Sequence, residues 1–219
     1  QALGAHHDLS SCAHVSIAKG IPVAAGLAGG SADAAATLVA LDRLWDLQTS
    51  DEDLLSIAAD LGSDVPFALI GGTAHGTGRG ELVEPIEVAQ TQWFVVLPSR
   101  TGGLSTPAVY AEYDRGEVAE IARPDELLKA LSVGVPLSQD LLRNDLTTPA
   151  QRLKPELEQT LALGEELGAE ATLLSGSGPT VLFLASDQGH AQELRGALID
   201  RGHQQVLAAP GPVAGAHVV

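Results

Sequence analysis

The stretch PVAAGLAGGSADAAATLVALDRLW (Pro22–Trp45) decides how this sequence folds. It places Gly26, Gly29 and Gly30 directly before a long apolar run. Glycine costs about 0.5–1 kcal/mol relative to alanine inside regular structure, so a cluster of glycines needs a local reason. Two interpretations are open: a tight turn between a strand and a helix, or a backbone that comes close to a ligand.

The elements around these glycines are predicted from their residue patterns. HVSIAKGIPV (14–23) alternates apolar and polar residues and predicts a strand. From Ser31 to about Leu47, apolar residues recur every three or four positions, which predicts an amphipathic helix. A second helix is predicted from the acidic residues 51–53 to Gly62. Residues 66–86 predict a pair of strands that turn near residues 78–80.

The rest of the chain predicts a second domain. WFVVLP (93–98) is typical of a buried strand, and PELEQTLALGEELG (155–168) of a helix with proline in its first turn and glycine at its end. Two short strands, a helix and a last strand follow at ATLLSG (171–176), TVLFLA (180–185), HAQELRGALIDRG (190–202) and QQVLAA (204–209). This order predicts an α+β protein in which residues 1–90 form one domain and residues 91–219 form a second, ferredoxin-like one.

The composition narrows the possible partners. The formal net charge is −16, from 12 basic and 28 acidic side chains. An acidic surface repels phosphate backbones, so we expect neither nucleic acid nor an anionic membrane as a partner. No apolar run reaches the roughly 18–20 residues of a membrane helix. The single cysteine, Cys12, allows no disulfide within the chain and fits the reducing cytoplasm.

A strand, a glycine loop and a helix in this order gather several main-chain amides at the positive end of a helix. Such a place suits a diphosphate or a triphosphate. Neither G-x-x-x-x-G-K-[ST] nor G-x-G-x-x-G is present, and Lys19 is the one lysine beside the loop. Lys19 is interpreted either as an exposed charge at the end of a strand or as a residue near a nucleotide. The chemistry alone therefore leaves both the tight turn and the phosphate loop open.

Four segments together carry a resemblance to a known family. Residues 22–33 resemble the ATP loop of the GHMP small-molecule kinases. The segments LGSDVPFALIGGTAHGTGRGE (61–81), NDLTTPA (144–150) and LLSGSGPTVLFL (173–184) agree with them in order and spacing. Within that superfamily the pattern is most similar to the 4-diphosphocytidyl-2-C-methyl-D-erythritol kinase family. The resemblance implies a two-domain fold: an N-terminal ribosomal-protein-S5-like domain, here incomplete, and a ferredoxin-like C-terminal domain.

The resemblance also implies that ATP binds through the main-chain amides of the glycine loop, together with Mg²⁺. The residues that it assigns to the nucleotide are Lys19, Pro22, Val23, Ala24, Ala25, Gly26, Leu27, Ala28, Gly29, Gly30, Ser31 and Ala32. The Ser31 hydroxyl is the group that would face phosphate or magnesium. From the residues alone, Ser31 is equally a helix N-cap, a role that serine fills well.

Asp64 is the predicted catalytic residue. An aspartate in a helix-ending turn before proline is by itself a turn or cap residue. Phosphoryl transfer to an alcohol needs a group near the attacking hydroxyl, and in the resembled family the aspartate of the G-[AS]-D-V-P segment, here Asp64, accepts that proton or orients the hydroxyl.

The predicted acceptor site comprises Thr106, Tyr110, Gly176 and Ser177. Thr106–Tyr110 resembles the family segment whose aromatic residue packs on the cytosine, although a tyrosine packed in the core is an alternative. From its residues alone, the turn at 175–179 is interpreted as a hairpin. With the resemblance, it is expected to close a cleft near Gly26–Gly30 and Asp64.

The implied reaction is ATP-dependent phosphorylation of the 2-hydroxyl of 4-diphosphocytidyl-2-C-methyl-D-erythritol, in the non-mevalonate pathway to isoprenoid precursors. The alternatives are another GHMP kinase, of mevalonate-pathway or homoserine type, and a nucleotide-binding remnant without catalysis. The chain has no methionine and begins at Gln1, so we expect a longer product whose preceding part carries the family's first-strand lysine in a P-A-K-x-N segment. The oligomeric state and the activity of these residues alone stay open.

Overall fold

The structure is a computed structural model that describes residues 1–10, 12–21, 23, 25–116 and 124–219. Contacts divide the chain into two compact units. Unit 1 comprises Gln1–Gly20, Ala28–Ile86 and Pro212–Val219, and unit 2 comprises Ile21–Leu27 and Glu87–Gly211. The units interleave along the chain, whereas the sequence predicted two continuous domains at 1–90 and 91–219. The domain boundary at residue 90 stays a prediction.

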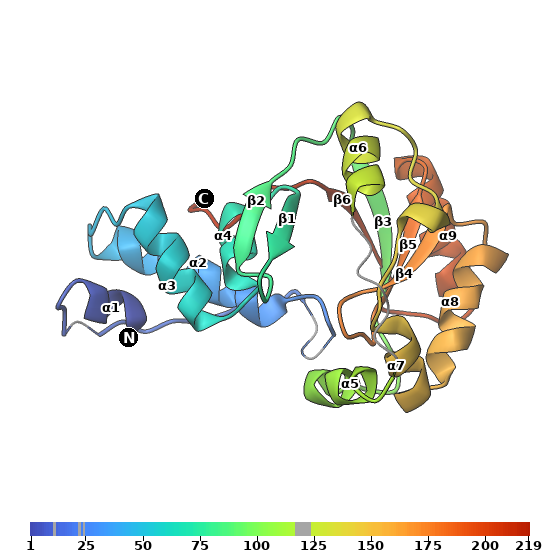
Figure 1. Ribbon diagram of the computed structural model, residues 1–219, viewed down its shortest axis with the longest axis horizontal. Coiled ribbons are helices and arrows are strands. Elements are labelled where there is room, and N and C mark those ends of the chain that lie inside the picture. The colour runs from blue at the N-terminus through green and yellow to red at the C-terminus, as the bar shows by residue number, and fades with distance from the viewer. Residues whose placement is uncertain (11, 22, 24, 117–123) are drawn as a thin grey trace. The chain divides into compact units, whose positions relative to one another are not determined.

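Unit 1 is a cluster of helices beside a small hairpin (Figure 1). Its elements are α1 (Ala2–His6), α2 (Gly29–Leu44), α3 (Asp51–Leu61), α4 (Val65–Ile70), β1 (Ala74–Thr77) and β2 (Leu82–Pro85). Helix α3 begins as predicted, because the Ser50 hydroxyl accepts a hydrogen bond of 3.1 Å from the Asp53 amide. The apolar faces of α2, α3 and α4 bury one cluster, formed by Ala35, Leu38, Ile57, Ala58 and Val65 together with Leu3.

Two predictions in unit 1 were wrong. Residues 14–20 are exposed and form no strand, since the described part of the chain offers them no paired neighbour, and an alternating pattern needs one to become a strand. Residues 66–70 form most of helix α4 instead of the first part of a strand pair. Pro66 stands in the first turn of α4, where its fixed backbone favours a helix. The predicted hairpin is confirmed farther on, with β1 and β2 antiparallel around residues 78–80.

The last residues of the chain pair with unit 1 rather than with unit 2. Gly71 forms an antiparallel bridge with Ala214, and the Gly72 amide donates a hydrogen bond of 2.7 Å to the Val213 carbonyl oxygen. A Cβ atom on Gly215 would lie 2.2 Å from the Leu69 carbonyl oxygen, so the two backbones meet where no side chain fits. The sequence pattern predicted no such return.

Unit 2 is a four-stranded antiparallel sheet with helices on both faces (Figure 1). Its elements are β3 (Gln92–Leu97), α5 (Thr106–Tyr113), α6 (Asp125–Val133), η1 (Gln139–Leu141), α7 (Thr147–Leu153), α8 (Glu156–Glu166), β4 (Ala171–Leu174), β5 (Val181–Ala185), α9 (Gln188–Asp200) and β6 (Leu207–Gly211). The strand order β4-β5-β3-β6 is the ferredoxin-like arrangement, so this prediction is confirmed.

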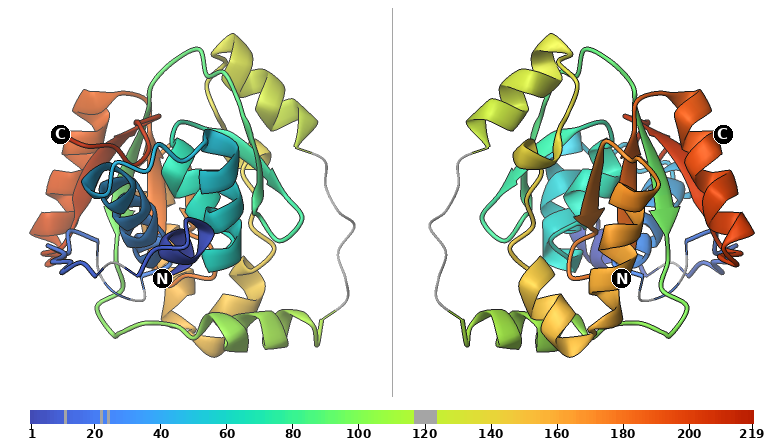
Figure 2. Two further views of the ribbon diagram at one scale, coloured as in Figure 1. Left: turned by 90° about the vertical axis from the view of Figure 1, so that its left-hand side faces the viewer. Right: turned by 90° about the vertical axis from the view of Figure 1, so that its right-hand side faces the viewer.

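The alternation of side chains along the central strands explains both faces of the sheet. Val95 of β3 lies opposite Phe183 of β5, and both are fully buried in the main core. Helices α8 and α9 cover this face of the sheet (Figure 2). Phe94 and Leu184 point to the other face, where they pack with Ala130 of α6. Within the described ranges, no helix is both long and apolar enough to cross a membrane.

Candidate active site

The glycine loop is fastened within unit 2 to the turn between β4 and β5. The Ser175 hydroxyl donates a hydrogen bond of 2.8 Å to the Gly26 carbonyl oxygen. Gly26 has a φ of +72°, and a Cβ atom there would lie 2.6 Å from the Gly178 carbonyl oxygen. Only glycine combines this left-handed backbone with so close an approach. Gly26 is therefore required by a contact between two main chains.

Helix α2 begins directly after the loop. Its N-cap is Ala28, in the left-handed conformation with a φ of +48°, and no side chain caps the helix. The alternative of Ser31 as the N-cap was wrong, since Ser31 is already inside the first turn. The first intrahelical bond joins the Ala32 amide to the Ala28 carbonyl oxygen at 2.9 Å. The amides of Gly29, Gly30 and Ser31 thus have no acceptor within the helix and can bind an anion.

Lys19 lies beside the start of α2, but not at the end of a strand. Its ammonium donates a hydrogen bond of 3.2 Å to the Gly29 carbonyl oxygen and forms an ion pair with Asp33. About a third of each side chain remains exposed, at 34% for Lys19 and 29% for Asp33. The Lys19 ammonium thus lies beside the first turn of α2, together with the compensating carboxylate of Asp33.

Asp64 stands at the N-cap position of helix α4 in unit 1. Its side chain makes no capping hydrogen bond, and the residue is exposed. Its carbonyl oxygen accepts from the Ala68 amide at 3.1 Å, which fixes the main chain on the helix. The carboxylate is therefore held on a rigid element without serving as the cap that the sequence alone suggested.

The predicted acceptor residues come together on α5 and the β4–β5 turn. The hydroxyl oxygens of Thr106 and Ser177 lie 2.8 Å apart, although 71 positions separate the residues. Along α5, Val109 is fully buried, while Tyr110 is 52% exposed. The alternative of Tyr110 as a core residue was wrong, and its ring is accessible to a flat ligand.

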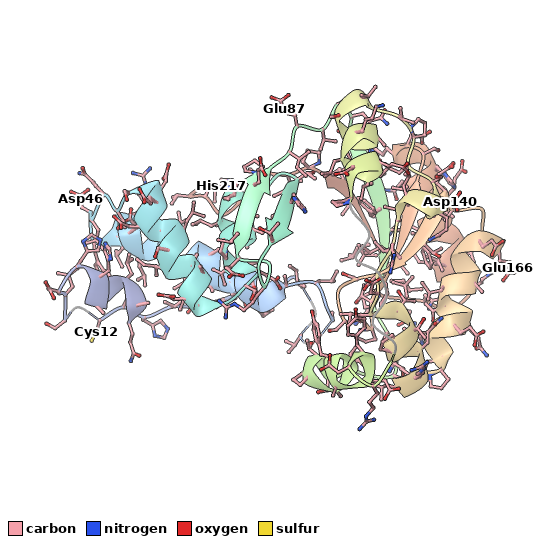
Figure 3. The ribbon with its side chains drawn as sticks, in the orientation of Figure 1. Cys12, Asp46, Glu87, Asp140, Glu166 and His217 are labelled. Carbon is pink, nitrogen blue, oxygen red and sulfur yellow. The ribbon has the colours of Figure 1, made fainter. Side chains whose placement is uncertain are left out.

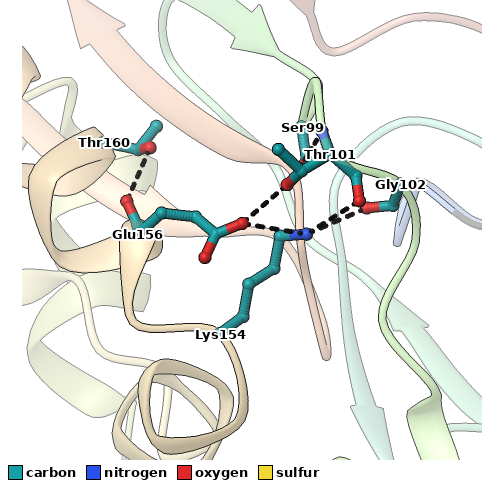
Figure 4. Close-up of polar contacts among 6 residues, drawn as sticks. All are labelled: Ser99, Thr101, Gly102, Lys154, Glu156 and Thr160. Atoms are coloured by element: carbon teal, nitrogen blue, oxygen red, sulfur yellow. Dashed lines mark hydrogen bonds and ion pairs between the residues drawn. The ribbon is translucent and has the colours of Figure 1, made fainter.

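A buried lysine holds the loop that leads from β3 to α5 (Figure 4). Lys154 donates hydrogen bonds of 3.2 Å to the Gly102 carbonyl oxygen and 3.5 Å to the Thr101 carbonyl oxygen, and it forms an ion pair of 3.4 Å with Glu156. The Thr101 hydroxyl donates to Glu156 at 2.6 Å and lowers the pKa of that carboxyl group. These contacts fix the loop that carries Thr106.

Sequence reasoning missed Ser175 and Asn144 as members of this site. Both lie in segments that carried the resemblance, but neither residue type reveals its partner. The Asn144 amide donates to the carbonyl oxygens of Leu174 at 2.8 Å and Gly176 at 2.7 Å. Pro22 and Ala24, two predicted nucleotide residues, lie outside the described residues.

The donor set can serve a metal that arrives with a nucleotide. In the ranges that the structure describes, no three histidine, cysteine, aspartate or glutamate side chains gather to hold a metal ion. Mg²⁺ in phosphoryl-transfer sites binds through one or two protein oxygens, substrate phosphates and waters. The Ser31 hydroxyl, in the first turn of α2, fits that limited role.

Comparisons with known proteins agree with this geometry. The family described as GHMP kinases N terminal domain matches residues 1–72, and the family described as GHMP kinases C terminal matches residues 126–204. A protein from a Nocardioides species named 4-diphosphocytidyl-2-C-methyl-D-erythritol kinase is 56% identical over 221 residues, covering 99% of this chain and 74% of its own length. A protein of the same name from Streptomyces coelicolor is 47% identical and covers 100% and 75%.

Solved structures give the same picture. A crystal structure of 4-(cytidine 5'-diphospho)-2C-methyl-D-erythritol kinase is 34% identical with a TM-score of 0.74, over 88% of this chain and 68% of that one. Homoserine kinase from Cytophaga hutchinsonii is 17% identical with a TM-score of 0.67, over 91% and 69%. The second likeness shows the fold alone.

Proposed function

The chain belongs to the 4-diphosphocytidyl-2-C-methyl-D-erythritol kinase family of GHMP kinases, and on this premise we propose that its protein transfers the γ-phosphoryl group of ATP to the 2-hydroxyl of 4-diphosphocytidyl-2-C-methyl-D-erythritol. The observation that carries the proposal is the fastening of the glycine loop to the β4–β5 turn through Gly26 and Ser175. This contact joins a predicted nucleotide residue to a turn that also carries predicted acceptor residues.

In this proposal the nucleotide binds along residues 22–32. The amides of Gly29, Gly30 and Ser31 donate to phosphate oxygens, and Lys19 adds a cation next to them. The contribution of Mg²⁺ would be to neutralise charge on the phosphates, with the Ser31 hydroxyl as one oxygen ligand. The net charge of −16 does not oppose this, because the contacts to phosphate are local amides.

The acceptor is held by α5 and the β4–β5 turn. The exposed Tyr110 ring stacks on the cytosine, and Thr106 with Ser177 and Gly176 contacts the diphosphate part of the acceptor. The oxygen of the 2-hydroxyl bonds to the γ-phosphorus of ATP, and ADP leaves. Asp64 accepts the proton that the hydroxyl loses in this step. The phosphorylated product would enter the later steps of isoprenoid precursor synthesis. The free, exposed thiol of Cys12 (Figure 3) is compatible with the reducing cytoplasm.

The test uses the full-length protein with ATP and three acceptors: 4-diphosphocytidyl-2-C-methyl-D-erythritol, homoserine and mevalonate. We expect turnover with the cytidine-containing acceptor alone, which excludes the other GHMP kinase types. Asp64→Asn is expected to lower kcat by about 10²–10⁴-fold while ATP binding, measured by calorimetry, is unchanged.

Asp60→Asn is the matched control, since Asp60 is an exposed carboxylate on α3 and has no part in the proposal. Its kinetic constants should equal those of the unmodified protein. Full turnover by Asp64→Asn would remove Asp64 from the mechanism. Binding of ATP without turnover of any acceptor would favour the nucleotide-binding remnant.

A further inference from the structure

The side-chain amide of Asn144 links two parts of the chain, residues 174–176 and the residues just before α7. Its nitrogen donates to the carbonyl oxygens of Leu174 and Gly176, at 2.8 and 2.7 Å. Its oxygen accepts from the Leu146 amide at 2.9 Å. This set of partners fixes the orientation of the amide, because a flipped side chain would turn its oxygen toward two carbonyl oxygens.

Both ends of this connection rest on buried structure. Asn144 lies three residues before α7, in which Pro149 and Ala150 are buried, and Leu146, the N-cap of α7, packs against the main core of unit 2. Leu174, on the other side, is 1% exposed. An amide held next to the start of α7 therefore helps to set the path of the main chain as it leaves β4.

The segment that Asn144 holds is the one that contacts the glycine loop. Ser175 stands between the two carbonyl groups that Asn144 binds, and its hydroxyl donates to the Gly26 carbonyl oxygen. The turn has two internal main-chain bonds of its own, from Ser175 to Thr180 at 2.9 Å and from Gly178 to Ser175 at 2.8 Å. The first of these orients the peptide plane that carries the Leu174 carbonyl group, whereas neither of them involves the Gly176 carbonyl group.

We propose that Asn144 is a positioning residue for the nucleotide loop: it holds residues 174–176 so that the Ser175 hydroxyl stays in place for Gly26. This inference rests on the proposed function, because it takes residues 22–32 as the nucleotide loop. Asn144 touches neither substrate in this account. It acts through Ser175, and losses at the two residues are therefore coupled.

Asn144→Asp is the sharpest variant, since aspartate has nearly the same shape and has no donor when ionised. In the full-length protein it is expected to raise the KM for ATP about tenfold, because two carbonyl groups lose their donor and face a negative charge. Asp145→Asn is the control: it changes the neighbouring residue, whose carboxylate pairs with the exposed Arg143, and should leave KM within about twofold. Asn144→Gln, which moves the amide by one methylene, replaces Asn144→Asp should the latter not fold.

The deciding measurement is a double-mutant cycle with Ser175→Ala. If Asn144 acts through Ser175, Asn144→Asp raises the KM for ATP by less than about threefold in the Ser175→Ala background. Independent, multiplying effects on KM would overturn the inference, and so would an unchanged KM with only a smaller folded fraction. Gly26→Ala in the same assay distinguishes a failure of the positioning role of Asn144 from a failure of the proposed nucleotide loop. If it raises KM while Asn144→Asp does not, the positioning role alone fails; if it leaves KM unchanged, the nucleotide loop itself is misassigned and the inference falls with it.

Discussion

The Ser175 hydroxyl donates to the Gly26 carbonyl oxygen across 149 positions of sequence. The two residues belong to two different motifs of the resembled family, each of which reads from its own sequence as a tight turn. Their contact explains why one glycine of the opening stretch, Gly26, is required, which neither turn explains alone. A main chain must pass within van der Waals distance of another main chain at Gly26.

Gly26→Ala is expected to weaken both stability and nucleotide binding. The added Cβ would lie 2.6 and 2.7 Å from two main-chain oxygens, at a φ of +72°. Backbone strain of this kind costs about 1–3 kcal/mol, so we expect a lower midpoint of urea unfolding and a KM for ATP raised by about tenfold. Gly196→Ala in α9, with nothing within 4 Å, is the control and should slightly stabilise the protein without changing KM. Wild-type kinetics for Gly26→Ala would contradict the tight contact.

Tyr110→Ala is expected to weaken acceptor binding with little effect on folding. Tyr110 is 52% exposed, and substitutions at such positions change the free energy of unfolding by about 0.5 kcal/mol or less. Loss of a base-stacking ring costs about 1–3 kcal/mol, which raises the KM for the acceptor by about 5- to 150-fold. Tyr110→Phe keeps the ring and should keep the KM. Steady-state kinetics with varied acceptor measure both variants, and an unchanged KM in Tyr110→Ala would exclude stacking.

Lys154→Met is expected to destabilise unit 2. The Lys154 side chain is 9% exposed, and its ammonium is the donor for the Thr101 and Gly102 carbonyl oxygens. Loss of these two part-buried hydrogen bonds from a charged donor costs about 1.5–3 kcal/mol, which urea unfolding can measure. Glu156→Gln, at the 49% exposed end of the same ion pair, should cost much less because water screens it. Equal losses from the two substitutions would show that the ion pair, rather than the carbonyl groups, carries the stability.

His203 is expected to make the protein less stable as pH falls below about 6.5. Burial, and secondarily the positive charge of Arg100, lower the pKa of His203 in the folded chain below its ordinary value of 6.5. Between the two pKa values the unfolded chain binds a proton that the folded chain does not, so stability decreases as the pH falls through this interval and does not change with this group above it. His203→Gln should remove this part of the pH dependence of the unfolding free energy between pH 5.5 and 7.5. An identical pH dependence in the variant would contradict it.

Local patterns predicted the elements whose own residues mark them. The helix at 155–168 and the strand at 93–98 were confirmed as α8 and β3, because proline, glycine and an uninterrupted apolar run mark them directly. The ferredoxin-like sheet followed from the order of such elements. Residues 14–20 failed for the opposite reason: alternation describes only one half of a strand pair, and the partner is not written in the segment itself.

The sequence predicted candidate site residues, but not the hydrogen bonds between them. The resemblance named Thr106 and Ser177 separately, and the structure adds that their hydroxyl oxygens lie 2.8 Å apart. Asn144 and Ser175 were missed as contacts, because a hydrogen bond to a distant carbonyl oxygen leaves no pattern in one sequence. The catalytic role of Asp64 and the nucleotide role of the loop remain proposals to be tested.

The bridge between Gly71 and Ala214 separates the order of synthesis from the order of folding. When a ribosome has completed α4, the residues that hydrogen-bond to the end of that helix have not yet been made, and the whole sheet of unit 2 must be translated first. Until residues 213–216 emerge, the backbone groups of residues 68–72 that pair with them can bond only to water, although the helices of unit 1 already bond internally. Unit 1 of this kinase therefore cannot complete its folding before residues 212–219 have been synthesised.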